Sequence, residues 1–338
     1  MTLRVGINGF GRTGRQAFRA WWEHRRGDFE IVAINRGPVE IRTHLLRYDS
    51  DYGRFPSTIE DGKDSFTVGG THEVRVFNAD DPAEIPWGEA KVDLVIDCTG
   101  KFRDAKQAKA HLRETVKKVL ISAPAKNDDW TVIMGANQSE YDPKSHHIIS
   151  AGSCTTNCVV LAVKVLDDAF GVERGMMTTV HSYTGDQNLV DNSHKDLRRA
   201  RAAGLNIVPT SSGASEAVGK IIPSLAGKFD GFAYRVPTPT VSVLDLVTSL
   251  RDTPSTGAIN EAYLAAAEGE LKGYMYYETD ELVSMDFKGH PGSAIHDAPT
   301  TLVIPGGMTK TMAWYDNEWG YSCRLTDVVA MIAERGLS

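Results

Sequence analysis

The sequence contains little of what marks several common classes of protein. It has only four cysteines among 338 residues, and because their spacings match no small disulfide-bonded domain, we expect free thiols and a reducing, cytoplasmic location. No apolar run reaches the roughly 20 residues that a membrane-spanning helix needs. Internal repeats and low-complexity segments are also missing, so the composition has no fibrous or disordered bias.

The chain also lacks an excess of basic residues. Its 37 lysines and arginines against 44 aspartates and glutamates give a formal net charge of −7, which argues against a general nucleic-acid or membrane-surface binder. The opening residues, MTLRVGINGFGR, run directly into a predicted strand, so we expect no signal or transit peptide. The length is that of two average domains.

In the first 150 residues, short apolar runs alternate with amphipathic stretches. Continuous β-branched runs are typical of strands buried on both faces, and strands that alternate with helices form a parallel, doubly wound sheet. The predicted strands cover residues 3–8, 29–35, 91–100, 118–124, 131–137 and 146–152, and the first predicted helix covers 15–26.

After residue 154 the pattern changes to longer strand-like runs, at 175–184, 232–250 and 309–322. These runs predict a second, α+β domain with a mostly antiparallel sheet. We therefore expect an α/β protein with two domains, 1–153 and 154–317. A C-terminal helix at about 318–338 is expected to pack back on the first domain.

The segment GFGRTG places Gly9, Gly11 and Gly14 in the pattern G-x-G-x-x-G, between a predicted strand and a predicted helix. In such a loop the first glycine permits a tight turn, the second lets the backbone approach a pyrophosphate, and the third lets the helix pack close to the strand. The phosphates then lie at the helix N-terminus, where free N–H groups favour an anion. The loop predicts a Rossmann-type dinucleotide-binding domain.

The second predicted strand ends at Asn35 and Arg36, where an NAD-binding domain has an acidic residue for the ribose 2′-hydroxyl. Arginine cannot accept the proton of that hydroxyl, but it pairs with a 2′-phosphate. The position therefore favours NADP, or the use of both cofactors, over strict use of NAD. In the alternative interpretation Arg36 is solvated and Asn35 alone holds the ribose.

The segment SAGSCTTNC carries two cysteines, Cys154 and Cys158. The other two, Cys98 and Cys323, lack the companions of a zinc site, a disulfide across four helical positions has poor geometry, and a redox pair has the spacing C-x-x-C. A nucleophile or a structural thiol remains. A strand that ends near Ser150 and leads into a helix would put Cys154 at a helix N-terminus, where the dipole lowers its pKa, with Cys158 one turn further on.

A nucleophilic thiol needs a base, and His181 in the segment TTVHSYTGD is the candidate. It stands at the end of the first strand predicted for the second domain. A neutral imidazole there could take the thiol proton, and as imidazolium it could stabilise the oxyanion of an attacked carbonyl. A single histidine is also compatible with a purely structural role.

Eight segments, in order along the chain, resemble those of the phosphorylating glyceraldehyde-3-phosphate dehydrogenase family. They are INGFGRTGR, HLLRYDSDYGRF, ISAPAKND, SCTTNC, TTVHSYTGDQ, RRARAAGLNIVPTSSGA, YRVPTPTVSVLDL and WYDNEWGYS. The resemblance implies that Cys154 is the nucleophile and His181 its activating base. It further implies that glyceraldehyde 3-phosphate forms a thiohemiacetal on sulfur, that a hydride passes to NAD or NADP, and that inorganic phosphate attacks the resulting thioester to give 1,3-bisphosphoglycerate.

The same resemblance implies a homotetramer and two sets of binding residues, and the cysteine spacing predicts no metal site. Asn317 would hold the nicotinamide carboxamide, and arginine forks and hydroxyls would bind the phosphates. The residues implied for the substrate and the attacking phosphate are Ser153, Thr155, Thr184, Arg198, Ser212, Gly213 and Arg235. Those implied for the cofactor are Asn8, Gly9, Phe10, Gly11, Arg12, Thr13, Gly14, Asn35, Arg36, Thr99, Gly100, Phe102, Ser122 and Asn317.

Three positions depart from the family's pattern. Arg36 stands where an aspartate is usual, Ala151 and Gly152 stand where Asn-Ala is usual, and Ser212 replaces a threonine. An erythrose-4-phosphate dehydrogenase shares most of the motifs and is the nearest alternative, whereas a non-phosphorylating aldehyde dehydrogenase would need a glutamate base that is not evident. A cofactor-binding regulator or an RNA binder is the alternative from another class, against which the retained catalytic pair and the net acidity argue.

Overall fold

The computed structural model describes residues 2–338, and contacts within the chain divide it into two compact units. The first comprises Met1–Val132, Ser139–Gly152 and Ser322–Ser338, and the second comprises Ile133–Gln138 and Ser153–Tyr321. Each unit is built on one large sheet with helices, so the expected α/β class is confirmed. Across residues 2–338, no helix combines the length and the apolar character needed to cross a membrane.

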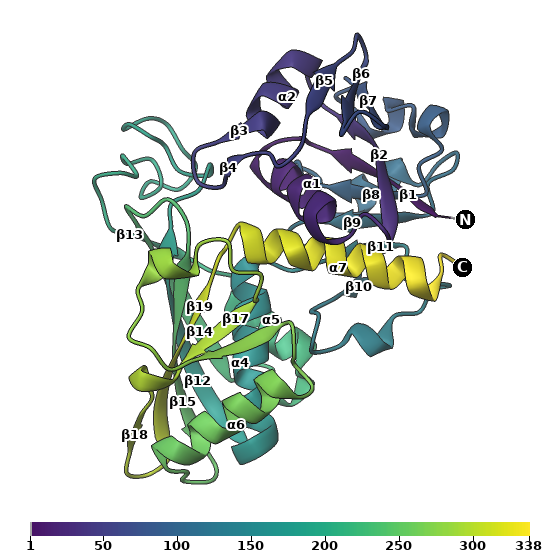
Figure 1. Cartoon of the computed structure of the whole chain (residues 1–338). Helices are drawn as coiled ribbons and strands as arrows, with labels where there is room; N and C mark the ends of the chain where they lie inside the picture. Colours follow the sequence, from purple (N-terminus) through teal and green to yellow (C-terminus); the bar gives the residue numbers. More distant parts are fainter. Residues whose placement is uncertain (1) are drawn as a thin grey trace. The chain divides into compact units, whose positions relative to one another are not determined.

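The sheet of the first unit has nine strands in the order β10-β11-β9-β8-β1-β2-β7-β6-β5 (Figure 1). Neighbours from β10 to β7 are parallel, as expected, and β5 and β6 add an antiparallel edge. The strands are β1 (Leu3–Asn8), β2 (Phe29–Asn35), β5 (Ile59–Asp61), β6 (Ser65–Val68), β7 (His72–Phe77), β8 (Leu94–Asp97), β9 (Lys118–Ile121), β10 (Trp130–Thr131) and β11 (Ile148–Ser150), with a separate pair of β3 (Tyr48–Asp49) and β4 (Gly53–Arg54).

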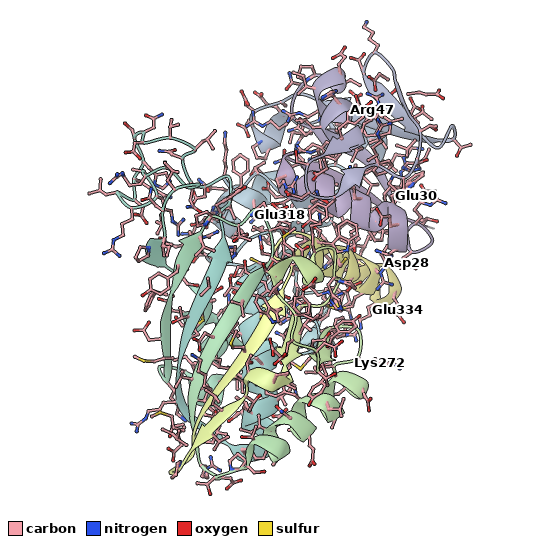
Figure 2. All side chains as sticks on the ribbon, turned by 60° about the vertical axis from the view of Figure 1, so that its left-hand side comes forward. Asp28, Glu30, Arg47, Lys272, Glu318 and Glu334 are labelled. Carbon is pink, nitrogen blue, oxygen red and sulfur yellow. The ribbon has the colours of Figure 1, made fainter. Side chains whose placement is uncertain are left out.

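The helices of the first unit are α1 (Arg12–His24), α2 (Val39–Arg47), α3 (Ala105–Ala108) and most of α7 (Trp319–Arg335). Helix α7 lies beside α1 (Figure 1), where an ion pair of 2.5 Å joins Asp327 to Arg25 at the end of α1. Arg25 also pairs with Asp28, at 3.1 Å, and Asp28 is labelled in Figure 2. The C-terminal helix is therefore part of the first unit from Ser322 onward, although its residues follow the second unit in the sequence.

The sheet of the second unit has eight strands, in the order β13-β14-β12-β15-β19-β17-β16, with β18 also paired to β19. Only the pairs β12–β14 and β16–β17 are parallel, so the expected mostly antiparallel sheet is confirmed. The strands are β12 (Val172–Ser182), β13 (Val208–Ser211), β14 (Phe229–Val236), β15 (Ser242–Leu250), β16 (Met275–Glu278), β17 (Ala294–Asp297), β18 (Leu302–Ile304) and β19 (Met308–Tyr315).

Helix α4 (Cys154–Phe170) occupies the core of the second unit, together with α5 (Ala214–Ile221) and α6 (Thr256–Glu268). Its residues from Thr155 to Val163 are all buried, and a helix that is apolar on almost every side is stable only when it is enclosed. The hydroxyl of Tyr263 on α6 donates to the carbonyl of Ala162, at 3.0 Å. The core thus fixes the position of α4 and of the thiol at its start.

Several expected strands are shorter than expected or shifted at their ends, and three differ more strongly from the observed ones. The strand expected at 131–137 ends at Thr131, because Gly135 takes a positive φ of 93° and the side chain of Asn137 accepts the N–H of Ile133 in a turn. The run at 232–250 divides into β14 and β15 around Pro237 and Pro239, residues that cannot donate to a sheet. The run at 309–322 ends as a strand at Tyr315, after which α7 begins.

Candidate active site

Cys154 is the first residue of α4, which follows the short β11 strand. The hydroxyl oxygen of Ser153 caps the helix by accepting the N–H of Thr156, at 3.0 Å, so the helix start is well defined. The thiol is half-buried, whereas Cys158 one turn later is fully buried in the hydrophobic core. The structure therefore confirms the predicted placement of both cysteines.

His181 lies near the end of β12, and its Nε2 is 3.5 Å from the Sγ atom of Cys154. The Nδ1 atom is 2.7 Å from the carbonyl oxygen of Ser182. Nδ1 has two polar neighbours: this carbonyl oxygen, which can only accept, and a guanidinium nitrogen of Arg235 at 3.0 Å, which can only donate. The carbonyl is the closer of the two, so we assign the proton to Nδ1 and the lone pair to Nε2, which faces the sulfur. The tautomer that a general base requires is therefore set by the backbone next to the histidine.

Arg235 on β14 is the cation nearest to this pair. Its guanidinium donates to the carbonyl of Ser182 at 3.1 Å and to the hydroxyl of Thr184 at 3.3 Å, and it lies 3.0 Å from Nδ1 of His181. The parallel register of β12 and β14, which places His181 opposite Arg235, explains the proximity. Thr184 and Arg235, both expected to bind phosphate, are thus adjacent to the base.

Burial and the charge of Arg235 lower the pKa of His181 to about 3, so the imidazole is neutral at neutral pH. Burial also raises the pKa of the Cys154 thiol, and the charge of Arg235 and hydrogen bonds from Thr155 offset only part of this rise. The lowered thiol pKa expected from the helix N-terminus is therefore wrong, because loss of hydration outweighs the charge of Arg235 and the hydrogen bonds to the sulfur. The thiol needs the neighbouring base to remove its proton.

The other residues expected near the phosphates occupy varied places. Gly213 immediately precedes α5, and the hydroxyl of Ser212 accepts the N–H of Ala214 at 3.3 Å, so both stand at a helix N-terminus. The buried hydroxyl of Thr155 bonds to the hydroxyl of Tyr315, at 2.9 Å. Thr155 therefore holds the wall of the site together rather than facing an open space.

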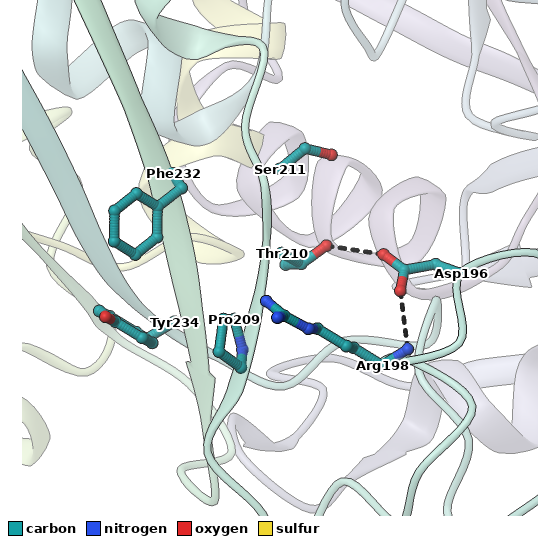
Figure 3. Close-up of a pocket in the computed structure, with 7 residues that line it drawn as sticks. All are labelled: Asp196, Arg198, Pro209, Thr210, Ser211, Phe232 and Tyr234. Atoms are coloured by element: carbon teal, nitrogen blue, oxygen red, sulfur yellow. Dashed lines mark hydrogen bonds between the residues drawn. The ribbon is translucent and has the colours of Figure 1, made fainter.

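Arg198 lies in the segment between β12 and β13 and lines an open pocket of about 640 Å³. Figure 3 shows its side chain directed along Pro209 and Thr210, with Phe232 and Tyr234 on the facing strand. Asp196 accepts the N–H of Arg198 and the hydroxyl of Thr210, each at 2.9 Å. Neither Thr184 nor Arg235 belongs to the lining of this pocket.

The glycine loop has the geometry that dinucleotide binding requires. Gly9 takes a positive φ of 90°, and a side-chain carbon at Gly14 would collide with the carbonyl oxygen of Gly9. A side-chain carbon at Gly11 would meet no atom within 4 Å, so the backbone there is open to a ligand. The N-terminus of α1 has no side-chain cap, which leaves its N–H groups for a pyrophosphate.

A buried hydrogen-bond network joins the ends of the strands next to this loop. The amide of Asn8 donates to Asp97 and that of Asn35 donates to Asn8, each at 2.8 Å, and Asn35 also bonds to the backbone of Ala79. Asp97 in turn accepts from the N–H and hydroxyl of Thr99. The side chain of Asn35 is thus committed inside the protein, and Arg36 is the more accessible residue at the end of β2.

The remaining expected cofactor residues surround the loop with different degrees of exposure. Phe10 is fully buried, Arg12 is held by Asp49 and Asp51 at 2.5 and 2.7 Å, and Gly100 takes a positive φ of 66°. Thr13, Phe102 and Ser122 are each half-buried. Within residues 2–338, no group of three or more His, Cys, Asp or Glu side chains could hold a metal ion.

Asn317 is held by two serines that sequence reasoning missed. The hydroxyls of Ser182 and Ser242 both donate to its Oδ1, at 2.9 and 3.0 Å, and the N–H of Ser182 donates to the hydroxyl of Ser242 at 3.1 Å. With two donors on Oδ1, the Nδ2 group must face the other way. No sequence spacing announces this trio, because its members come from β12, β15 and the turn after β19.

A glycine loop suited to a dinucleotide and a thiol paired with a neutral imidazole are features of an NAD(P)-dependent oxidoreductase that acts on an aldehyde. Comparison with known sequences refines this class. Residues 3–105 match the family described as "Glyceraldehyde 3-phosphate dehydrogenase, NAD binding domain", and residues 153–317 match the corresponding "C-terminal domain". The chain belongs to the glyceraldehyde-3-phosphate dehydrogenase family.

Individual relatives match along the whole chain. The chain is 52% identical over 335 residues to glyceraldehyde-3-phosphate dehydrogenase 1 of Streptomyces avermitilis, with 99% of both chains covered. It is 50% identical over 338 residues to glyceraldehyde-3-phosphate dehydrogenase of Geobacillus stearothermophilus, with 100% of both covered. The glyceraldehyde-3-phosphate dehydrogenase of Mycobacterium avium is 50% identical over 339 residues, with 99% of both covered.

Proposed function

We propose that this protein oxidises glyceraldehyde 3-phosphate to 1,3-bisphosphoglycerate, with inorganic phosphate as the second substrate and NAD or NADP as the hydride acceptor. The observation that carries the proposal is the distance of 3.5 Å between Sγ of Cys154 and the unprotonated Nε2 of His181. Family membership over the full length supports the same reaction.

His181 acts first, as the general base. It removes the thiol proton while the sulfur attacks the aldehyde carbon, which gives a thiohemiacetal whose oxygen the imidazolium then stabilises. The nicotinamide ring of the bound cofactor supplies the acceptor for the hydride. Loss of that hydride, with transfer of the hydroxyl proton to His181, leaves an acyl group on Cys154 as a thioester. An oxygen of inorganic phosphate then attacks the acyl carbon and displaces the sulfur, which frees the thiol for another turnover.

Arg235 and Thr184 are the proposed anchors of the substrate phosphate, with Arg198 as a further ligand. The charge of Arg235 lowers the pKa of His181, and a phosphate dianion on that guanidinium would offset it. Substrate binding would thus strengthen the base at the moment when it is needed. The attacking phosphate is assigned to Ser153 and to the N-terminus of α5 at Ser212 and Gly213, where backbone N–H groups favour an anion.

Residues 1–153 with the C-terminal helix are proposed as the cofactor-binding domain, and 154–317 as the catalytic domain. A homotetramer is proposed from family membership, and large apolar side chains exposed between β12 and β13 support burial against further copies of the chain. Those side chains are Leu189, Val190, Leu197, Leu205 and Ile207, each at least 66% exposed. A cytoplasmic location is proposed because all four cysteines are free.

The test is reduction of NAD and NADP by glyceraldehyde 3-phosphate with and without inorganic phosphate. The reaction is followed by the absorbance of the reduced cofactor. Steady turnover should require phosphate, and the Cys154→Ser variant should bind cofactor normally but not turn over. Erythrose 4-phosphate assayed in parallel identifies the preferred aldehyde. Turnover that continues undiminished without phosphate, or in Cys154→Ser, would refute the proposal.

A further inference from the structure

Three arginines lie in sequence around the end of β2 in the first unit, where Arg42 is close to Arg36 and Arg15 is close to Arg42. Arg36 follows β2 directly, Arg15 comes from the first turn of α1, and Arg42 comes from the first turn of α2. The guanidinium of Arg42 packs against Gly37, so closely that a side-chain carbon on that glycine would collide with it. In dinucleotide-binding folds, the end of the second strand is where the ribose 2′ position lies.

Hydrogen-bond donors in this cluster are unused. Within residues 2–338, the side chain of Arg42 makes no hydrogen bond or ion pair, and its buried Nε has no acceptor. The Nε of Arg15 is likewise buried without a partner, while one terminal nitrogen of Arg15 donates to the carbonyl of Phe10 at 3.2 Å. Buried donors without acceptors are costly, so a cluster that contains two of them is suited to an acceptor-rich ligand.

The charges of the cluster are poorly balanced by the protein itself. Burial and the charge of Arg36 lower the pKa of Arg42, and burial and the charges of Arg12 and Arg42 lower the pKa of Arg15. Two carboxylates face the group. Asp49 is shared with Arg12 and Gln16, and Asp80 forms an ion pair with Arg36.

We propose that Arg15, Arg36 and Arg42 form a subsite for the 2′-phosphate of NADP, with Arg42 as its central ligand. The inference rests on the proposed function in one respect, since it takes the bound nucleotide to be the hydride-accepting cofactor. A phosphate dianion offers enough acceptors for both terminal nitrogens and the Nε of a guanidinium. It also supplies the negative charge that the three arginines lack.

Asp80 sets the strength of this subsite. Its side chain is 87% exposed, so exchange of its carboxylate for a phosphate on Arg36 costs little. In the absence of a 2′-phosphate, Asp80 neutralises Arg36 and lets the ribose hydroxyl of NAD approach. The chain is therefore expected to bind both cofactors, with the balance shifted to NADP by the two arginines that Asp80 does not reach.

The experiment is isothermal titration of the full chain with adenosine 2′,5′-bisphosphate and adenosine 5′-monophosphate, which differ only in the 2′-phosphate. The wild type should bind the bisphosphate about 10-fold or more tightly, the amount expected for one charge-assisted contact. Arg42→Gln should remove most of this preference without lowering the affinity for the monophosphate. Asp80→Asn should increase the preference for the bisphosphate. Arg36→Gln provides a second test should Arg42→Gln not fold, as judged by thermal unfolding.

The matched control is Arg47→Gln. Arg47, labelled in Figure 2, belongs to the same helix as Arg42. Its guanidinium, however, is bound by Asp61, at 2.6 Å, and by the carbonyl of Ile59. This variant should keep the wild-type preference. Equal wild-type affinities for the two nucleotides, or a preference that survives both Arg42→Gln and Arg36→Gln, would overturn the proposal. Because titration does not depend on turnover, those results leave the dehydrogenase assay free to succeed or fail separately.

Discussion

Asn317 allows a test of whether a side chain of the second unit is already oriented for the nicotinamide before the cofactor binds. Its Oδ1 accepts hydrogen bonds from Ser182 and Ser242, which are 0% and 1% exposed. The side-chain amide is therefore held in one of its two orientations before any ligand arrives. Ser182 also accepts the Nδ1 proton of His181 on its carbonyl oxygen, so one residue orients both the base and the proposed carboxamide anchor.

The magnitude follows from the number of hydrogen bonds lost. Each contributes about 0.5 to 1.5 kcal/mol, which corresponds to about 2- to 12-fold in a dissociation constant. Ser182→Ala and Ser242→Ala should each weaken NAD binding within that range, and the double variant should weaken it more than either. An Oδ1 atom left without donors also costs about 1 to 3 kcal/mol of folding stability, so the double variant should melt at a lower temperature.

The assay compares titrations of NAD with those of ADP-ribose, which lacks only the nicotinamide. The serine variants should lose affinity for NAD and keep it for ADP-ribose. Thr248→Val is the matched control, because this buried hydroxyl also lies on β15 but bonds to Thr309 on β19, so both affinities should remain unchanged there. If the double variant lost affinity for NAD and for ADP-ribose equally, or for neither, the assignment of Asn317 as an oriented nicotinamide anchor would be refuted.

Three further predictions concern the loop, the phosphate anchor and acid stability. Gly14→Ala should abolish dinucleotide binding and lower the melting temperature, because its methyl group would collide with the carbonyl of Gly9; retained affinity by titration would contradict the close packing. Arg235→Gln should raise KM for glyceraldehyde 3-phosphate about 10- to 100-fold, the value of a charge-assisted hydrogen bond, and should slow alkylation of Cys154 at pH 7, because the charge of Arg235 lowers the pKa of that thiol; an unchanged KM would exclude it as a phosphate ligand. Burial lowers the pKa of His296 to about 3, whereas an unfolded histidine has a pKa of about 6.5. The contribution of neutral His296 to the free energy of unfolding is therefore complete above pH 6.5. It is lost as the pH falls toward 3, by up to about 1.4 kcal/mol per pH unit. His296→Gln should reduce the pH dependence of the free energy of unfolding over that range, as measured by urea unfolding at a series of pH values. An unaltered pH dependence would show that His296 does not titrate there.

Much of the architecture was predictable because its signals are local. Glycine spacing and buried apolar runs identify the parallel sheet and the loop at Gly9, and the small residues before Cys154 predict the helix that begins there. The predictions failed at 131–137, where a turn bonded by Asn137 interrupts an apolar run. Apolar runs of that length do not distinguish a strand from a buried turn.

The sequence by itself determined the class of fold, the family, and which residues are proposed as nucleophile and base, since each depends on residue types in short, ordered segments. Tertiary structure alone decided how those groups behave. It raised the thiol pKa through burial, chose the tautomer of His181 through the Ser182 carbonyl, and joined Asn317 to two distant serines. It also brought Arg42 close to Arg36, and Arg15 close to Arg42. Hydration, tautomers and like-charge contacts depend on distances in space between residues remote in the chain, and residue spacing carries no record of those distances.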